Sequence, residues 1–314
     1  MGRYLLWRAL GIPPLLLGAS VVIFLLLRFS PGDPAEVILA QHGEYAVDRE
    51  TVAQLRREWG LDLTLPAQYG RWLTQVLRGD FGRSFATSRP VGELLAERLP
   101  ATLLLSGAAL LVALLVALPL GILSAVRSGG LLDGVCRLVA LAGVSMPSFW
   151  LGLLLVWTFS IRLGWLPAIG SGTARHVILP TIALAAGVAA TQTRLIRASL
   201  LEVLAQPYVD VARAKGLSER LVVVRHGVRN ALIPSVTALA LSLGGLLGGA
   251  AVIETVFAYP GLGKLAVDAI GARDYPVIQA YALLMTLVFI VSSLLVDVVY
   301  GLIDPRIRLS AGAA

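Results

Sequence analysis

Charged residues are scarce in this sequence. Of its 314 residues, 14% are charged and 57% are hydrophobic, whereas soluble domains carry about 25% charged residues. A shortage of this size is typical of a protein with several membrane-spanning segments. The formal net charge of +7 could indicate an acidic partner or nucleic acid, so the positions of the charges have to decide.

Cysteine and histidine are almost absent. Cys136 is the only cysteine, which excludes a disulfide within the chain and a cysteine-rich metal site. We interpret it as a small packing residue at the edge of an apolar stretch. The three histidines, His42, His176 and His226, lack the spacing of metal ligands, so we expect no metal site.

Motifs for catalysis are also missing. No G-x-x-x-x-G-K-[ST] phosphate loop occurs, since PGLGK at Pro260–Lys264 lacks the first glycine and the Ser or Thr. Neither H-E-x-x-H nor G-x-S-x-G is present. We therefore expect no catalytic residues, no ATP hydrolysis and no cofactor bound by this chain. A secondary transporter driven by ions remains an alternative of a different class, although we find neither inverted repeats nor a carboxylate relay.

Long apolar runs define the fold class. A helix needs about 20 apolar residues to cross the hydrocarbon core of a bilayer, and no region predicts a sheet. The sequence therefore predicts an all-α, polytopic membrane protein with six transmembrane helices. The six predicted spans are Ala9–Phe29, Thr102–Val126, Val135–Leu163, Val177–Ala198, Ala231–Phe257 and Val277–Ile303.

One sizeable polar region interrupts the spans. It covers residues 30–99, between residues 1–29 with the first helix and the core of residues 100–303; residues 304–314 form a tail. DRETVAQLRREWGLD has apolar residues at helical spacing, with Asp48 as a possible cap and Gly60 at its end. AQYGRWLTQVL predicts a second amphipathic helix. We expect a small helical insertion on one face of the membrane.

The distribution of charge predicts the orientation. The loop Leu195–Asn230 holds six basic and three acidic residues, and Arg3, Arg8, Arg306 and Arg308 flank the outermost spans. The insertion holds eight Arg against ten Asp and Glu. Because cytoplasmic loops are enriched in Lys and Arg, we expect both termini and the loop Leu195–Asn230 in the cytoplasm and the insertion in the periplasm. This pattern leaves no reason to expect nucleic acid as a partner.

A short polar segment, YVDVARAKGL at Tyr208–Leu217, stands out between apolar spans. Pro207 suits the first position of a helix, Asp210 its positive end, and Gly216 the left-handed position after its last turn. The segment predicts a short helix outside the bilayer. On the residues alone, a solvated cytoplasmic loop explains it equally well.

The D-V-A-R-A-K-G run of this segment resembles the E-A-A-x-x-x-G motif of ABC-importer permeases. The rest of the chain is similar to the dipeptide, oligopeptide and nickel branch of that family. The matching stretches, in order, are PGDPA, YGRWL, GDFGRSF, SMPSFWLG, GWLPAIG, HVILP, ARAKGL, RHGVRNALIP, ETVFAYPGLGKLAVDAIGARDYPVIQ and LIDPRIR. They cover nearly the whole chain, so the chain is identified as a member of this family of type I importer permeases.

This resemblance implies the partners and a mechanism. In the family, a coupling helix, here at about residues 205–220, docks on a cytoplasmic ATPase subunit that binds ATP and Mg. It implies a second, homologous permease subunit, two ATPase subunits, a periplasmic substrate-binding protein and the bacterial inner membrane as location. The residues that carry the coupling role by this resemblance are Asp210, Ala212, Arg213, Ala214, Lys215 and Gly216.

Further candidates follow from position within the spans and loops. The translocation path could involve Met146, Trp150, Gln192, Arg194 and Glu254, although a packed kink, snorkelling or an interfacial cap would explain several of them. Docking of the binding protein could involve Arg83, Tyr259, Arg273 and Asp274. The overlapping G-x-x-x-G patterns of Gly244, Gly245, Gly248 and Gly249 favour close helix packing.

The substrate is predicted from loop length and local likeness. The loop Gly164–His176 is short, as in nickel-type members of the branch, and SMPSFWLG and its surroundings are similar to nickel-import permeases. We therefore expect nickel as the substrate, as a chelate, with di- or oligopeptides as the alternative.

Overall fold

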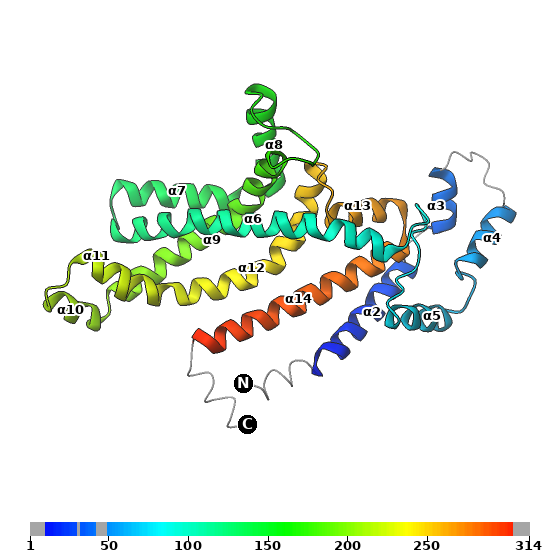
Figure 1. Cartoon of the computed structure of the whole chain (residues 1–314), viewed down its shortest axis with the longest axis horizontal. Helices are drawn as coiled ribbons and strands as arrows, with labels where there is room; N and C mark the ends of the chain where they lie inside the picture. Colours follow the sequence, from blue (N-terminus) through cyan, green and yellow to red (C-terminus); the bar gives the residue numbers. More distant parts are fainter. Residues whose placement is uncertain (1–9, 30–31, 42–48, 304–314) are drawn as a thin grey trace. The chain divides into compact units, whose positions relative to one another are not determined.

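The computed structural model of the chain describes residues 10–29, 32–41 and 49–303 (Figure 1). These residues form helices and turns, and the only β-type pairing among them is an isolated bridge between Arg83 and Pro90. The all-α prediction is confirmed for this part of the chain. Arg3, Arg8, Asp48 and the predicted tail 304–314 lie outside the described residues.

Two compact units make up the chain. Among the described residues, the first, which we call the core unit, comprises those within 102–259 and 291–303; the second, the insertion unit, comprises those within 10–101 and 260–290. Two helices, α6 (Val91–Val126) and α14 (Tyr275–Ile303), have residues in both units. Helix α6 therefore begins earlier than the span predicted at Thr102.

Apolar helices lie at the predicted spans, and two of the spans are bent. Helices α6, α9 (Arg175–Leu204) and α14 are long and apolar enough to cross a membrane. Two bent pairs, Leu131–Ser145 with Ser148–Arg162 and Glu219–Leu239 with Gly244–Val256, raise the number of spans to five if each pair counts as one. Helix α2 (Ile12–Arg28), the remaining predicted span, has 17 residues.

The first bend lies at Pro147. Helix α7 (Leu131–Ser145) is followed by helix α8 (Ser148–Leu155), which continues as the π-helix η1 (Val156–Arg162). The chain direction bends by 106° between α7 and the segment of α8 and η1. Figure 1 shows α8 turning away from the axis of α7. Proline disfavours helical geometry in the preceding residue, and Met146 accordingly has an extended conformation, with φ −85° and ψ 126°. The predicted break in the third span is confirmed.

The second bend lies within α12 (Arg229–Val256), at the paired glycines. The segments before and after residues 240–243 differ in direction by 56°. Sharp kinks occur at adjacent glycines because they stabilise the helix poorly, and Gly244 and Gly245 stand directly after the break. The glycine-rich stretch thus redirects the helix.

Helix α9 is the centre of the core unit. It packs against α7, α8 and α12. Its buried residues include the small residues Ala183, Ala185, Ala189 and Ala190, which let neighbouring helices approach closely. The end of α9 packs with α6 and α12 through a cluster of Ala125, Leu200 and Ala231.

The contact between α6 and α9 depends on a glycine. A Cβ atom added at Gly121 would lie 2.8 Å from Cβ and Cγ2 of Ile196 and 3.0 Å from the carbonyl oxygen of Thr193. These atoms belong to a branched side chain and to helix backbone, so they cannot move aside cheaply. This position therefore fixes how closely the two helices pack.

We expect Gly121→Val to lower the melting temperature of the detergent-purified subunit by about 5 °C or more, because overpacking costs about 1–3 kcal/mol. Gly107→Val is the matched control on the same helix, since a Cβ there meets no described atom within 4 Å. Circular dichroism against temperature gives the measurement. Equal melting temperatures for both variants would contradict the close packing at Gly121.

The insertion unit is built from short amphipathic helices. They are α3 (Pro34–Gln41), α4 (Arg49–Glu58), α5 (Leu65–Leu77) and α13 (Leu262–Ala272), beside α2 and the first parts of α6 and α14. The sequence predicted α4 and α5 but not α3. Gly60 follows α4 with a φ of +66°, as its predicted role at a helix end requires. The buried cluster joins Val91, Leu94 and Leu95 of α6 with residues of α13 and α14.

Candidate functional site

The predicted coupling helix is present. Helix α10 (Pro207–Ala214) begins with Pro207, carries Asp210 in its first turn and Arg213 in its last. Gly216 follows with a φ of +80°, the left-handed geometry predicted for it. Helix α9 ends at Leu204, so only Ala205 and Gln206 separate the two helices.

An apolar seam attaches α10 to the segment that follows it. Val209 and Ala212 are buried together with Val222 of the π-helix η2 (Val222–Val228). Leu204 and Leu217 cover this cluster. The predicted coupling residue Ala212 therefore belongs to the face of α10 that packs against the permease itself.

Ion pairs and hydrogen bonds reinforce this attachment. Arg213 lies 3.1 Å from Asp210 and 2.9 Å from Glu219 of the short helix α11 (Glu219–Leu221). The hydrogen bonds with Glu219, above all, raise the pKa of the Arg213 guanidinium. Asn230 donates a hydrogen bond to the Tyr208 hydroxyl at 3.0 Å. Residues from α10, α11 and α12 thus form one braced unit.

The opposite face of α10 is exposed. Asp210, Arg213, Ala214, Lys215 and Gly216 are exposed, as are two apolar side chains, Tyr208 (43%) and Val211 (54%). Among the six predicted coupling residues, only Ala212 is buried. A rigid helix with a mixed apolar and charged face suits contact with another protein.

A groove runs along α9 in the core unit. One section, with a volume of about 340 Å³, is lined by α7, α8, α9 and α12 and includes Met146, Gly187 and Gly245. A second section, of about 980 Å³, lies between α7 and α9 and includes Arg137 and Arg194. Thr191 lines both sections, so they adjoin at this residue. Of the predicted path residues, Met146 lines the first section and Arg194 lines the second.

The other predicted path residues lie outside this groove. Trp150 is 45% exposed on α8. Gln192 is buried in α9, and neither its Nε2 nor its Oε1 atom has a hydrogen-bond partner among the described residues. Glu254 is buried and accepts a hydrogen bond of 2.6 Å from Thr102. Burial raises the pKa of nearby Tyr259, and the charge of Glu254 adds to this effect.

Three of the predicted packing glycines, Gly245, Gly248 and Gly249, have no close neighbour within this chain. A Cβ at Gly245 or Gly248 would meet no described atom within 4 Å, and one at Gly249 would meet Leu184 only at 3.5 Å. Gly245 and Gly249 line the groove. Close packing within the chain instead uses glycines such as Gly121. Packing of the G-x-x-x-G residues against a second subunit stays a prediction.

A buried ion pair near the start of α7 was missed by the sequence analysis. The Arg197 guanidinium of α9 donates to both carboxylate oxygens of Asp133, at 2.7 and 2.8 Å. Ser124 of α6 and the Gly129 N–H also donate to Asp133, which is 1% exposed. Asp133 of α7 therefore ties α6 and α9 to its own helix. The third span was predicted to begin at Val135, so Asp133 was counted as a loop residue.

The candidates for binding-protein docking differ in exposure. In the insertion unit, Arg83 is exposed and Arg273 is half-buried, donating to the Gly32 carbonyl at 3.2 Å. Asp274 is 2% exposed and accepts hydrogen bonds from Ser84 Oγ and the N–H groups of Phe85 and Ala86. Asp274 therefore holds the loop that presents Arg83. Tyr259, in the core unit, is buried.

We expect Thr191→Trp to reduce transport at least about tenfold, because an indole at the junction of the two groove sections would fill the space that both share. ATP hydrolysis by the assembled complex should persist. Leu111→Trp is the control, because Leu111 is exposed on α6 and lines neither section. Equal transport by both variants, measured as uptake into proteoliposomes, would contradict a role of the groove.

Several helices long and apolar enough to cross a membrane indicate a membrane protein, and comparison with known proteins supplies its family. Residues 117–309 match the family described as "Binding-protein-dependent transport system inner membrane component", and residues 1–106 match its N-terminal family. The chain belongs to this family of ABC-importer permeases.

Individual relatives cover nearly the whole chain. It is 45% identical over 308 residues to the glutathione transport system permease protein GsiC of Salmonella paratyphi A, covering 98% of this chain and 99% of that one. It is 43% identical over 308 residues, with the same coverage, to GsiC of Escherichia coli strain K12.

Solved structures share the fold. The chain is similar to the MetNI methionine ABC transporter in inward-facing conformations, with a TM-score of 0.57 and 20% identity over 67% of this chain and 96% of that one. An amino acid ABC transporter with histidines gives a TM-score of 0.54 and 18% identity, covering 66% and 93%.

Family membership confirms the predicted class of protein and its lack of enzymatic activity. The chain is a multi-pass inner-membrane permease subunit of an ABC importer, and it is not itself an enzyme. It works with ATPase and substrate-binding components. The ion-driven secondary transporter is thereby excluded. Nickel stays a prediction, because the Salmonella and Escherichia relatives are both named for glutathione transport.

Proposed function

We propose that this subunit forms half of the translocation path of an ATP-driven importer for small peptides of the glutathione type. The single observation that carries the substrate is the 45% identity over 98% of the chain to a permease named for glutathione transport. Peptides were the alternative to nickel in the sequence analysis. The short loop Gly164–His176 favours a nickel chelate as the second candidate.

The groove along α9 supplies the path in this proposal. It is open on one side, so a second, homologous permease subunit completes it. Its exposed cations, Arg137 and Arg194, suit a substrate with carboxylates. Gly245 and Gly249 in its wall leave room for the substrate or for close approach of the second subunit.

Helix α10 transmits the action of ATP. Its exposed face docks on one of two cytoplasmic ATPase subunits, which bind ATP and Mg; this chain binds neither. Only two residues separate α10 from α9, so displacement of α10 moves the end of a helix that lines the groove. The termini lie in the cytoplasm in this arrangement, and residues 30–99 lie in the periplasm.

The periplasmic binding protein docks on the insertion unit. Arg83 and Arg273 offer cationic contacts, and Asp274 keeps the loop of Arg83 in place through its three hydrogen bonds. Tyr259 is buried in the core unit, so the proposed docking surface does not include its side chain.

Uptake by cells that express the complete transporter tests the function. Labelled glutathione, labelled dialanine and radioactive nickel are compared with and without deletion of this subunit. We expect ATP-dependent uptake of glutathione or dialanine that is lost on deletion. Loss of nickel uptake alone would move the substrate to the second candidate, and uptake that survives ATP depletion would contradict the mechanism.

A further inference from the structure

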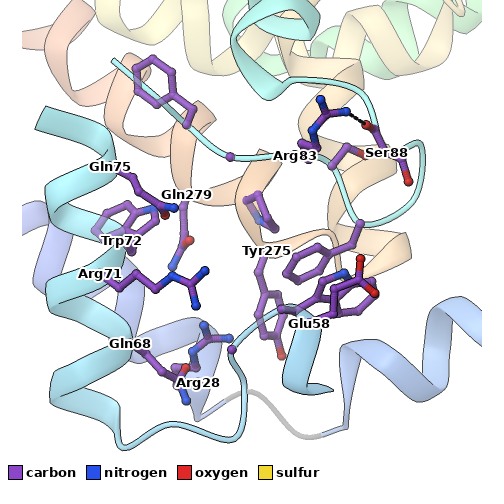
Figure 2. Close-up of a pocket in the computed structure, with 17 residues that line it drawn as sticks. Arg28, Glu58, Gln68, Arg71, Trp72, Gln75, Arg83, Ser88, Tyr275 and Gln279 are labelled. Atoms are coloured by element: carbon purple, nitrogen blue, oxygen red, sulfur yellow. Dashed lines mark hydrogen bonds between the residues drawn. The ribbon is translucent and has the colours of Figure 1, made fainter. Parts of the chain in front are cut away.

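A polar cavity lies inside the insertion unit. Its volume is about 310 Å³, and it is lined by α2, α5, the start of α14 and the loop of residues 81–88. Figure 2 shows Arg28, Arg71, Gln279 and Tyr275 around this space. A volume of this size falls in the range of small-molecule sites, which begins at about 300 Å³.

Buried polar atoms in the cavity wall lack partners. Among the described residues, none forms a hydrogen bond with the Nε and Nη1 atoms of Arg28 or with Nε2 of Gln279. The Arg28 guanidinium lies over the rings of Phe24 and Tyr275, at 5.1 and 5.2 Å from their centres. Aromatic faces attract a cation but do not accept its N–H groups. The wall therefore offers buried donors, which cost free energy unless an acceptor reaches them.

The wall also offers one free acceptor. The Nε2 atom of Gln68 donates to the carbonyl oxygens of Leu61 and Leu63, at 3.2 and 2.7 Å. These bonds fix the amide so that Oε1 is the remaining atom, and Oε1 is buried without a partner among the described residues. Gln68 thus provides a site for an N–H donor in the cavity that also holds the Arg28 donors.

The charge of the wall favours an anion. Arg28, Arg71 and Arg83 line the cavity, and Glu58 is the only acidic residue among the described lining residues. Arg83 donates to the Ser88 carbonyl at 3.0 Å, which occupies one of its five donors, so all three guanidinium groups keep N–H groups for a ligand. A guanidinium binds a carboxylate through charge-assisted hydrogen bonds, which are about twice as strong as neutral ones.

We propose that this cavity binds an amino acid or short peptide, with its carboxylate on Arg28 and Arg71 and an N–H group on Gln68. The presence of donors and an acceptor in one cavity distinguishes this ligand from inorganic phosphate, which at neutral pH presents mainly acceptors. The choice of a peptide as ligand rests on the proposed function. The assignment of an anion site rests on the lining residues alone. The cavity lies beside the loop held by Asp274, so a ligand there would contact the predicted docking surface.

Binding by the purified transporter in nanodiscs, without binding protein or nucleotide, tests the inference. Isothermal titration uses three probes: dialanine, glutathione and inorganic phosphate. We expect saturable binding of dialanine and glutathione, weakened at least about tenfold by Arg28→Gln, and much weaker binding of phosphate. Arg78→Gln is the matched control, because Arg78 directly follows α5 but does not line the cavity.

A second variant guards against misfolding of Arg28→Gln. Gln279→Glu keeps both arginines and adds a carboxylate that competes for them, so it should also abolish dialanine binding. Binding unaffected by either variant would overturn the inference. Binding of phosphate alone, or a signal that follows phosphatidylglycerol or phosphatidylethanolamine in the nanodisc, would assign the cavity to a free anion or a lipid headgroup instead.

The outcomes separate this inference from the proposed function. If cells take up glutathione but the cavity binds none of the probes, the cavity inference is wrong and the proposed function stands. If cells take up nickel and dialanine binding depends on Arg28, the cavity inference stands and the proposed transport substrate is wrong.

Discussion

A subunit carrying Asp133→Asn is expected to assemble poorly and to lose transport almost completely. The change leaves the Arg197 guanidinium without its carboxylate in a largely buried site, and breaking a buried ion pair is among the most destabilising single changes. The pair joins α7 to α9, two helices that line the groove, and Ser124 of α6 also donates to Asp133. We expect the melting temperature of the purified subunit to fall by more than about 5 °C.

Asp268→Asn provides the matched control for this prediction. Asp268 also pairs with a cation, Lys264, at 2.6 Å, but its side chain is 59% exposed. Exposed pairs contribute about 0–1 kcal/mol, so assembly and transport should persist. If Asp133→Asn and Asp268→Asn have equal melting temperatures, the ion pair does not stabilise the core unit.

Gly216→Val is expected to uncouple ATP hydrolysis from transport. Gly216 has a φ of +80°, where a β-branched side chain is strained by about 1–2 kcal/mol or more. The strain should displace Lys215 and the exposed face of α10 without disturbing the spans. Membrane insertion should be normal, ATPase activity should continue, and uptake should fall at least about tenfold. ATP hydrolysis and uptake are measured in the same proteoliposomes.

Gly216→Asn separates backbone strain from side-chain size. Asparagine tolerates the left-handed conformation, and a Cβ at this position meets no described atom within 4 Å. The Asn variant should therefore keep most of the transport activity. Coupled transport by a properly assembled Gly216→Val complex would contradict the role of this turn.

Local features of the chain were predictable from sequence. The apolar runs predicted the spans because membrane helices need continuous apolar length. Pro147 predicted the break in the third span, and Pro207 with Gly216 predicted the limits of α10, because proline fixes φ and glycine permits the left-handed conformation after a helix. Helix α3 was not predicted, since its eight residues are too few for a clear helical period.

Contacts between distant residues could not be predicted in this way. Asp133 and Arg197 are 64 positions apart, and Ser84 and Asp274 are 190 apart. Each residue alone is compatible with an exposed loop, and only the fold shows that its charge or hydroxyl is buried. The same applies to Arg28, which lies at the end of an apolar helix and faces residues from two other helices.

Site-directed photocrosslinking from α10 tests the central claim, that ATP turnover reaches the membrane through this helix. In a Cys136→Ala background, a benzophenone is attached to Val211→Cys on the exposed face or to Val209→Cys on the buried face. The account predicts a crosslink to the ATPase subunit from position 211, with a yield that changes on ATP binding, and none from position 209. A crosslink from position 211 only to lipid or to a periplasmic protein would contradict it.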